Sequence, residues 1–353
     1  MEAGLLEDYL DHITESVRKS LKFPEKTIAH GFDGALDEGC IAEIGYDEDS
    51  SEDLIISAID GGSNTIVKTP TFALVLNRVY CNKFDRMRKL DFVELSTFIS
   101  STRVVTEGDK VLFETETYPQ QGACPLERTK INADDPDMRI GRMRGDLERA
   151  ISMARRFCEW TFVSRALGSG AEFIVMDGSL QTAFAGESEL ANRVYEEAAS
   201  KGAIVAGLSK SSMIYTSEGY PLVGFLNVLA KRRGLSKWIA KVGRSEEWAP
   251  RAEVYFVKLH EGADRAFRLD VFERAGEANV ARLVKSLQAN SKYFAFPGYP
   301  YALIDAHTYA RVGGEEAMHI RDLILDKLDL EDASRLEQSE RALMGHDVLD
   351  ELG

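Results

Sequence analysis

Cysteines and long hydrophobic runs are scarce in this sequence, and both absences restrict the class of protein. Only four cysteines occur in 353 residues, and their positions lack the paired spacing of a zinc site. These are Cys40, Cys81, Cys124 and Cys158. We therefore expect reduced thiols in a cytoplasmic protein. No stretch approaches the roughly 20 apolar residues of a membrane span, and the acidic, helix-periodic N-terminus does not have the pattern of a signal peptide.

Positive charge is also in deficit, because 43 Lys and Arg face 58 Asp and Glu, which gives a net charge of −15. This balance argues against indiscriminate binding of polyanions over the whole surface. Local basic groups remain at 142–149, at Arg155 and Arg156, and at 231–244. Each group is either a solvated helix face that balances nearby acids or part of a basic groove.

The order of predicted elements favours an α/β fold. Hydrophobic periodicity predicts strands near 53–60, 69–82, 88–97 and 110–113, a long helix over 138–167, and then a βαβ unit over 171–208. Three early strands followed by helix, strand, helix and strand predict a ribonuclease H-like mixed sheet flanked by helices.

Further elements are expected around this core. The pattern predicts an amphipathic N-terminal helix over 1–30, a β-hairpin insertion over 252–272, and helices over 276–290 and 314–328. We expect an N-terminal helix with an acidic linker over 1–52, a ribonuclease H-like core over 53–328, and a charged, helical tail over 329–353. The tail is either a docked helix or an arm that binds a partner.

Two aspartates occupy similar positions at the ends of predicted strands. Asp60 follows Leu54-Ile55-Ile56-Ser57-Ala58-Ile59 and precedes Gly61-Gly62-Ser63-Asn64, and Asp177 follows Phe173-Ile174-Val175-Met176 and precedes Gly178-Ser179. Asp-Gly is a common turn dipeptide, but a repeated acid at a strand end also suits a divalent metal. We interpret the pair as a candidate metal site.

A third acid is expected from the predicted long helix. Glu159 borders the apolar face near Cys158 and Phe162, and Glu148 lies 11 residues earlier, about three turns away on the same face. Glu159 also has the spacing for ion pairs with Arg155 or Arg156 on the helix surface. Spacing alone leaves the choice between these two glutamates open.

The segment 296–307 carries the remaining candidates. His307 ends an apolar stretch, where a neutral imidazole can bind a metal or transfer a proton, and Asp305 is a competing ligand. Tyr299 lies on a constrained turn between Gly298 and Pro300. Lys210, in Gly207-Leu208-Ser209-Lys210, follows a predicted strand and is a candidate phosphate contact.

Together these motifs resemble the NurA family of DNA end-processing nucleases. The resemblance runs from about residue 53 to the C-terminus. It rests on the order of the Ile-Asp-Gly-Gly-Ser turn, Glu159, the Met-Asp-Gly-Ser-Leu turn, Gly-Leu-Ser-Lys, and Tyr299 with His307 eight residues later.

The resemblance implies a metal-dependent DNA nuclease. Family members have a ribonuclease H-like core, act as Mn²⁺-dependent 5′–3′ exonucleases and single-strand endonucleases, form homodimers, and work with the hexameric HerA translocase in DNA end resection and double-strand break repair. Carried over by position, Asp60, Glu159, Asp177 and His307 are the expected metal ligands, with Mg²⁺ as an alternative ion. Tyr299 completes the expected catalytic set. Lys210, Arg155 and Arg156 are expected to contact DNA.

Two other functions remain open from the sequence. An actin-like or sugar-kinase-type ATPase also uses Asp-Gly turns to hold phosphates, although only Arg311-Val312-Gly313-Gly314 faintly resembles an adenosine-site motif. A non-catalytic assembly subunit would use the acidic surface and the terminal helices for docking.

Overall fold

The computed structural model describes residues 3–20, 23–45, 54–122, 128–139, 142–244 and 251–342. Cys124 and the end of the tail after residue 342 lie outside this part of the chain. The chain forms two compact units. The first comprises 1–52, 178–180 and 207–299, and the second comprises 53–177, 181–206 and 300–353. The segments 1–52, 53–328 and 329–353 expected from the sequence stay predictions about domain organisation.

The second unit is organised around long antiparallel strands. Its strands are β4 (Ile55–Lys68), β5 (Phe72–Asp85), β6 (Arg88–Glu107), β7 (Lys110–Gln121), β8 (Arg128–Asn132) and β9 (Phe173–Asp177). β4 to β8 pair antiparallel in chain order, whereas β9 pairs parallel to β4. β10 (Ile204–Ser209) follows β9 in the sheet. The order β6-β5-β4-β9-β10 is the ribonuclease H-like arrangement, so the predicted fold class is confirmed.

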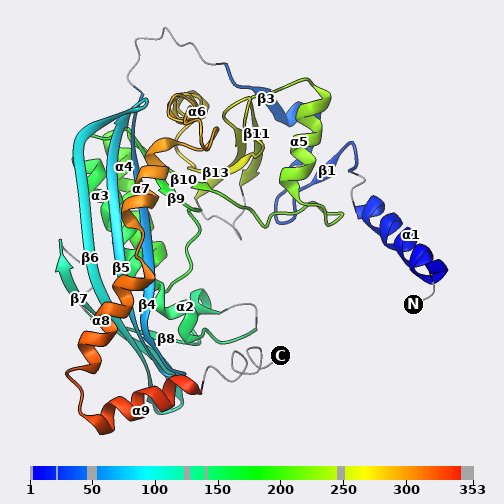
Figure 1. Ribbon diagram of the computed structural model, residues 1–353. Coiled ribbons are helices and arrows are strands. Elements are labelled where there is room, and N and C mark those ends of the chain that lie inside the picture. Colours follow the sequence, from blue (N-terminus) through cyan, green and yellow to red (C-terminus); the bar gives the residue numbers. More distant parts are fainter. Residues whose placement is uncertain are drawn as a thin grey trace. The chain divides into compact units, whose positions relative to one another are not determined.

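Helices cover the two faces of β4 and β5 (Figure 1). α3 (Met153–Gly168) and α7 (Tyr301–Ala310) both contact these strands. The sides they occupy follow from two consecutive glycines, because successive residues of a strand face opposite sides. A Cβ on Gly61 would lie within 3 Å of Glu159 on α3, and a Cβ on Gly62 would lie within 3 Å of the Ala310 carbonyl of α7. α3 and α7 therefore lie on opposite faces of β4.

The glycine run after Asp60 is not a turn, contrary to the sequence-based expectation. β4 continues through it, and Gly61 and Gly62 pair with Val79 and Arg78 of β5. Glycine in a strand interior marks either a bend or a close approach of another backbone. Here the absence of side chains lets α3 and α7 approach the same stretch of strand.

The single helix predicted over 138–167 is also wrong. The structure has a 3₁₀ turn, η2 (Pro136–Met138), then α2 (Leu147–Ile151), then α3. Asp146 is extended, and its side chain accepts a hydrogen bond from the Arg149 N–H, which fixes the start of α2. Met138, which precedes α2, is fully buried in a cluster that includes Leu147 and Phe113.

The remaining helices of the second unit are α4, α8 and α9. Their bounds are α4 (Glu187–Lys201), α8 (Gly314–Leu325) and α9 (Leu330–Arg341). The helix predicted over 314–328 is confirmed. The tail forms a docked helix as far as Arg341. Arg321 of α8 donates two hydrogen bonds of 2.6 Å to Glu340 of α9, and Leu336 of α9 packs against a small core beside β4 and β5.

The first unit contains a second group of antiparallel strands. Its elements are α1 (Ala3–Ser20), β1 (Thr27–Ile28), β2 (Ala35–Leu36), η1 (Glu38–Cys40), β3 (Ile41–Glu43), α5 (Leu222–Arg232), β11 (Trp238–Arg244), β12 (Ala252–Lys258), β13 (Phe267–Phe272) and α6 (Glu277–Ala289). The predicted hairpin and the helix predicted over 276–290 are confirmed, since β12 pairs with β13. β3 and β11 extend that hairpin into a sheet, which the sequence analysis missed.

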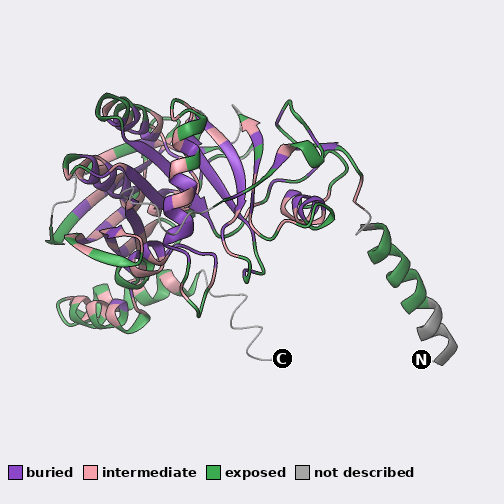
Figure 2. Ribbon diagram, turned by 90° about the horizontal axis from the view of Figure 1, so that it is seen from above, coloured by how far each residue is buried: buried purple, intermediate pink, exposed green. Residues whose placement is uncertain are grey.

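The N-terminal helix is shorter than the predicted 1–30, since α1 ends at Ser20, and it exposes its apolar residues. Tyr9, Leu10, Ile13 and Val17 of α1 are at least half exposed, and the described part of this helix is exposed throughout (Figure 2). Within the described chain, no helix combines the length and the apolar character that a membrane span requires.

Candidate metal centre

Asp60 is held rigidly in the middle of β4. The strand pairs with β5 on one side, through Asp60 and Tyr80, and with β9 on the other, through Ile59 and Met176. Asp60 is only 8% exposed, and its Oδ1 accepts a hydrogen bond of 2.7 Å from the Gly61 N–H. By strand alternation Asp60 shares the face of Gly62, which is the face that α7 covers.

Asp177 is the last residue of β9, as the sequence analysis predicted. Gly178 follows it with φ of +111°, a conformation that disfavours any residue with a Cβ. Because β9 runs parallel to β4 in register from Ile56 with Phe173 to Ile59 with Met176, Asp177 comes level with Asp60. The parallel pairing thus brings together two acids that are 117 positions apart in the sequence.

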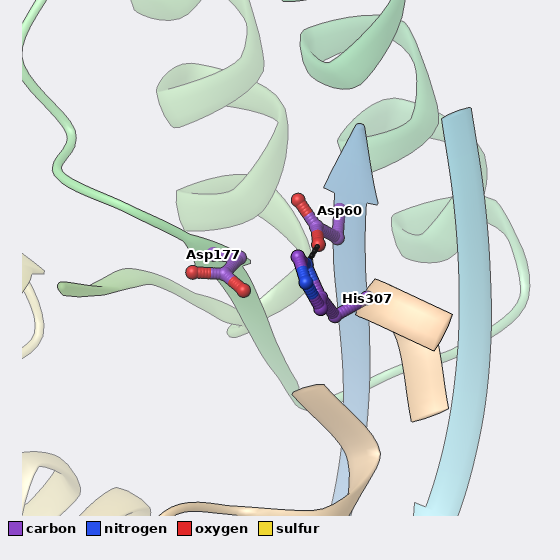
Figure 3. Close-up of side chains that lie close together, drawn as sticks. All are labelled: Asp60, Asp177 and His307. Carbon is purple, nitrogen blue, oxygen red and sulfur yellow. Dashed lines mark hydrogen bonds and ion pairs between the residues drawn. The ribbon is translucent and has the colours of Figure 1, made fainter. Parts of the chain in front are cut away.

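His307 completes the cluster from α7. Its Nδ1 lies 2.8 Å from Asp60 Oδ2, while its side chain is 60% exposed. Asp60, Asp177 and His307 each offer a ligand atom, and these three atoms lie within 4.8 Å of one another. Figure 3 shows the three side chains gathered where β4, the end of β9 and α7 meet.

The donor chemistry of this cluster fits a divalent metal ion. Carboxylate oxygens and imidazole nitrogen together suit Mn²⁺ and related ions, whereas carboxylate oxygens alone favour Mg²⁺. Two carboxylates this close repel each other without a cation. Among the described residues, this is the group of three that could hold a metal ion.

Glu159 lies beside this cluster but is not part of it. Its carboxylate abuts Gly61, the strand residue after Asp60, on the opposite face of β4. It is 4% exposed and pairs with Arg155 and with Arg156, the latter at 3.1 Å. The ion pairs considered in the sequence analysis therefore exist, although the acid is buried and not on the helix surface.

The other two candidate acids have different partners. Glu148 lies on α2, where its exposed carboxylate pairs with Lys68. The helix break at Ser152 means that Glu148 and Glu159 do not share one continuous helix face. Asp305 pairs with Lys89 at 2.7 Å and accepts a hydrogen bond of 2.8 Å from Asn82, so its position anchors α7 to β5.

A buried polar network that the sequence analysis missed supports α3. Glu187, fully buried at the start of α4, accepts hydrogen bonds from Arg156 at 2.7 Å, from the Trp160 indole at 2.8 Å and from the Ala183 N–H at 2.7 Å. Burial would lower the pKa of Arg156, but the charges of Glu159 and Glu187 outweigh it and raise that pKa. Arg156 is thus a structural cation with a side chain only 13% exposed.

Arg155, by contrast, is more exposed and contacts β4 directly. Its Nη1 donates to the Gly61 carbonyl at 3.0 Å as well as to Glu159. It also lines a small cavity of about 110 Å³ together with Ser63 and Ser152.

Tyr299 and Lys210 belong to the first unit. Tyr299 is 1% exposed and packs edge-to-face against Phe267, with ring centroids 5.1 Å apart. The Lys210 Nζ lies 5.3 Å from the centre of the Tyr299 ring. The two residues are neighbours within that unit, and their expected roles in the reaction stay predictions.

Comparisons with known proteins bear on these observations. A family model described as the NurA domain matches residues 54–312, a range that includes Asp60, Glu159, Asp177 and His307. No curated protein sequence matches significantly. Among solved structures, Ciona intestinalis endonuclease V bound to DNA is similar over 85% of this chain and 96% of its own, at 11% identity and a TM-score of 0.38.

Two further structures show comparable distant similarity. The catalytic domain of human endonuclease V is similar over 81% of this chain and 92% of its own, at 10% identity and a TM-score of 0.35. Aquifex aeolicus Argonaute is similar over 74% of this chain and 28% of its own, at 9% identity and a TM-score of 0.29. The family match over most of the chain carries the identification: this protein belongs to the NurA family, and that membership supports its assignment as a DNA nuclease.

Proposed function

We propose that this protein is a metal-dependent deoxyribonuclease that hydrolyses phosphodiester bonds during DNA end resection. The observation that carries the proposal is the convergence of Asp60, Asp177 and His307 within 4.8 Å. In the proposal, these residues hold Mn²⁺, or alternatively Mg²⁺. When bound, such an ion activates water and neutralises the charge that develops on a phosphate.

The side chains of the cluster have separable tasks in this proposal. Ionised Asp60 can only accept hydrogen bonds, so His307 Nδ1 donates to it and Nε2 carries the lone pair. The Asp60 carboxylate thereby fixes the imidazole tautomer and its orientation. With 60% of the side chain exposed, the imidazole is accessible to bind the ion or to accept a proton from water.

From the family pattern alone we propose Glu159 as a third acid, although its carboxylate lies on the face of β4 opposite the Asp60, Asp177 and His307 cluster. Its pairing with Arg155 requires that this arginine exchange partners when substrate arrives. A phosphate is a strong bidentate partner for a guanidinium, so Arg155 could leave Glu159 for the DNA backbone. Arg156 is omitted from the proposed DNA contacts, because Glu159 and Glu187 already occupy it in a buried setting.

The finer activity is proposed from family membership. We expect 5′–3′ exonuclease and single-strand endonuclease activity, a homodimer, and a functional partnership with a HerA-type hexameric translocase. The alternative functions, an ATPase or a non-catalytic assembly subunit, would show no cleavage of DNA, and ATP binding would distinguish the first from the second.

The test is cleavage of end-labelled single- and double-stranded DNA with Mn²⁺, Mg²⁺ or EDTA. The Asp60→Asn and His307→Gln variants should each lose at least about 100-fold in rate. Asp109→Asn, an exposed aspartate with no ion-pair partner among the described residues, is the matched control and should cleave normally. Full Mn²⁺-dependent activity in Asp60→Asn would refute the assignment of this cluster as the catalytic metal site. Labels at the 5′ and 3′ ends report polarity, and added HerA-type partner reports whether the translocase is required.

A further inference from the structure

A polar pocket in the first unit has the composition of an anion site. It encloses about 190 Å³ and lies where the end of β10, α5, β12 and the loop before β13 meet. This is several times the space that a single water molecule needs. Such a volume admits a phosphate group with part of its sugar.

Three cations line this pocket and a single acid accompanies them. The cations are Lys210, Arg265 and Arg268, and the acid is Asp264. Ser209, Ser211, Ser212 and Asn227 add hydroxyl and amide groups. Arginine, lysine, serine and asparagine are the side chains that usually contact phosphate oxygens, whereas one carboxylate among three cations disfavours a metal ion.

The base of the pocket is preorganised. Arg268 is 5% exposed, and its Nε and Nη2 donate to the two Asp270 oxygens at 2.7 and 2.9 Å. Asp270 is fully buried and also accepts from the Leu180 N–H at 3.0 Å. These bonds fix the plane of the guanidinium and leave Nη1 for another acceptor.

The rim of the pocket supplies uncommitted groups. Arg265 is exposed, and neither it nor the Asn227 amide has a hydrogen-bond or ion-pair partner among the described residues. A fixed arginine at the base and an unpaired arginine at the rim together suit a group with several anionic oxygens.

We propose that this pocket binds a phosphate group of DNA, with Arg265 and Asn227 as contacts that no motif of the sequence indicates. The identity of the ligand as a DNA phosphate rests on the proposed nuclease function. Two sources share this chemistry: the terminal phosphate monoester of a strand end, and an internal phosphodiester of the backbone.

The experiment measures binding without cleavage. Fluorescence anisotropy in EDTA reports the Kd of the full-length protein for short single strands that carry a 5′-phosphate, a 3′-phosphate or neither. Arg265→Gln should weaken binding about fivefold, because one charge-assisted contact is lost. Asp264→Asn should tighten binding, because it removes the one acid from the lining. Arg232→Gln on α5, an exposed arginine outside the pocket, makes the same charge change and should have less than a twofold effect.

The arms of this experiment distinguish the two sources and the two proposals. An Arg265→Gln effect confined to one phosphorylated end assigns a terminal phosphate, whereas equal weakening of all three strands assigns the backbone. Equal Kd values for Arg265→Gln and Arg232→Gln, or no binding by the wild type, would contradict the proposal that this pocket binds a phosphate group. If Arg265→Gln still cleaves DNA at saturating concentration, the nuclease proposal is unaffected. If the wild type binds DNA in a phosphate-dependent manner but never cleaves it, the nuclease proposal is wrong and the pocket proposal stands.

Discussion

His307 Nδ1 lies 2.8 Å from Asp60 Oδ2 and thereby joins helix α7 to the central strand β4. The two residues are 247 positions apart in the chain, and the contact depends on how closely the helix approaches the strand. Gly62 permits that approach, since a side chain there would meet the backbone of Ala310. The position of His307 relative to Asp60 therefore depends on how α7 packs against Gly62, a residue that has no side chain.

Substitution of Asp177 by Asn should stabilise the metal-free protein. The Asp60 and Asp177 ligand atoms lie within 4.8 Å, and removal of one like charge should raise the free energy of unfolding by about 1 kcal/mol. Urea unfolding in EDTA measures this difference. Mn²⁺ should raise the Tm of the wild type by several degrees and have little effect on Asp177→Asn. Destabilisation of the variant in EDTA would contradict the repulsion argument, and Asp109→Asn serves as the control.

Substitution of Gly62 by Ala should impair both stability and activity. The added Cβ would approach the Ala310 carbonyl within 3 Å, and neither backbone can yield easily, so the expected cost is about 1–3 kcal/mol. Displacement of α7 should also lower kcat by moving His307. Gly168→Ala is the matched control, because its Cβ would meet nothing within 4 Å. It lies at the end of α3 and should be neutral or stabilise by about 0.5 kcal/mol. Equal stability of the two variants would show that α7 moves freely.

Glu114 should make the stability of the protein sensitive to acid. Hydrogen bonds from Arg128 and Arg103 lower the pKa of this β7 carboxyl from 4.5 to about 2. Because the folded pKa is depressed, the stabilisation is complete above pH 4.5 and is lost as the pH falls toward 2. Urea unfolding between pH 5 and pH 2.5 should therefore show a shallower acid decline in Glu114→Gln than in the wild type. Parallel declines would show that other groups control acid stability.

The sequence was sufficient to predict the order of the core elements along the chain and the position of Asp177 at the end of a strand. β9 is a short apolar run that ends in Asp-Gly, and both the strand end and the positive φ at Gly178 follow from that pattern. The hairpin of β12 and β13 is likewise local, since its register depends on alternation within one short segment.

The features that the sequence did not indicate depend on long-range contacts. Gly61 and Gly62 have the composition of a turn, yet the approach of α3 and α7 makes them part of a strand. Glu187 gives no signal among the acids at the start of α4, although it is the buried partner of Arg156 and Trp160. The partners of Glu159 followed from helical spacing, but its burial did not.

Because β4 is paired on both of its edges, the three cluster residues differ in how readily local unfolding displaces them from the site. Asp60 and Asp177 lie on strands that pair directly with each other, and β4 also pairs with β5, whereas His307 lies on a ten-residue helix that packs on one face. Amide hydrogens in such a strand exchange only on large-scale opening, whereas a peripheral helix can open by itself. A local opening of α7 would remove the imidazole and leave both carboxylates in place. The protein would then retain an acidic half-site that is ready to regain its histidine when the helix returns.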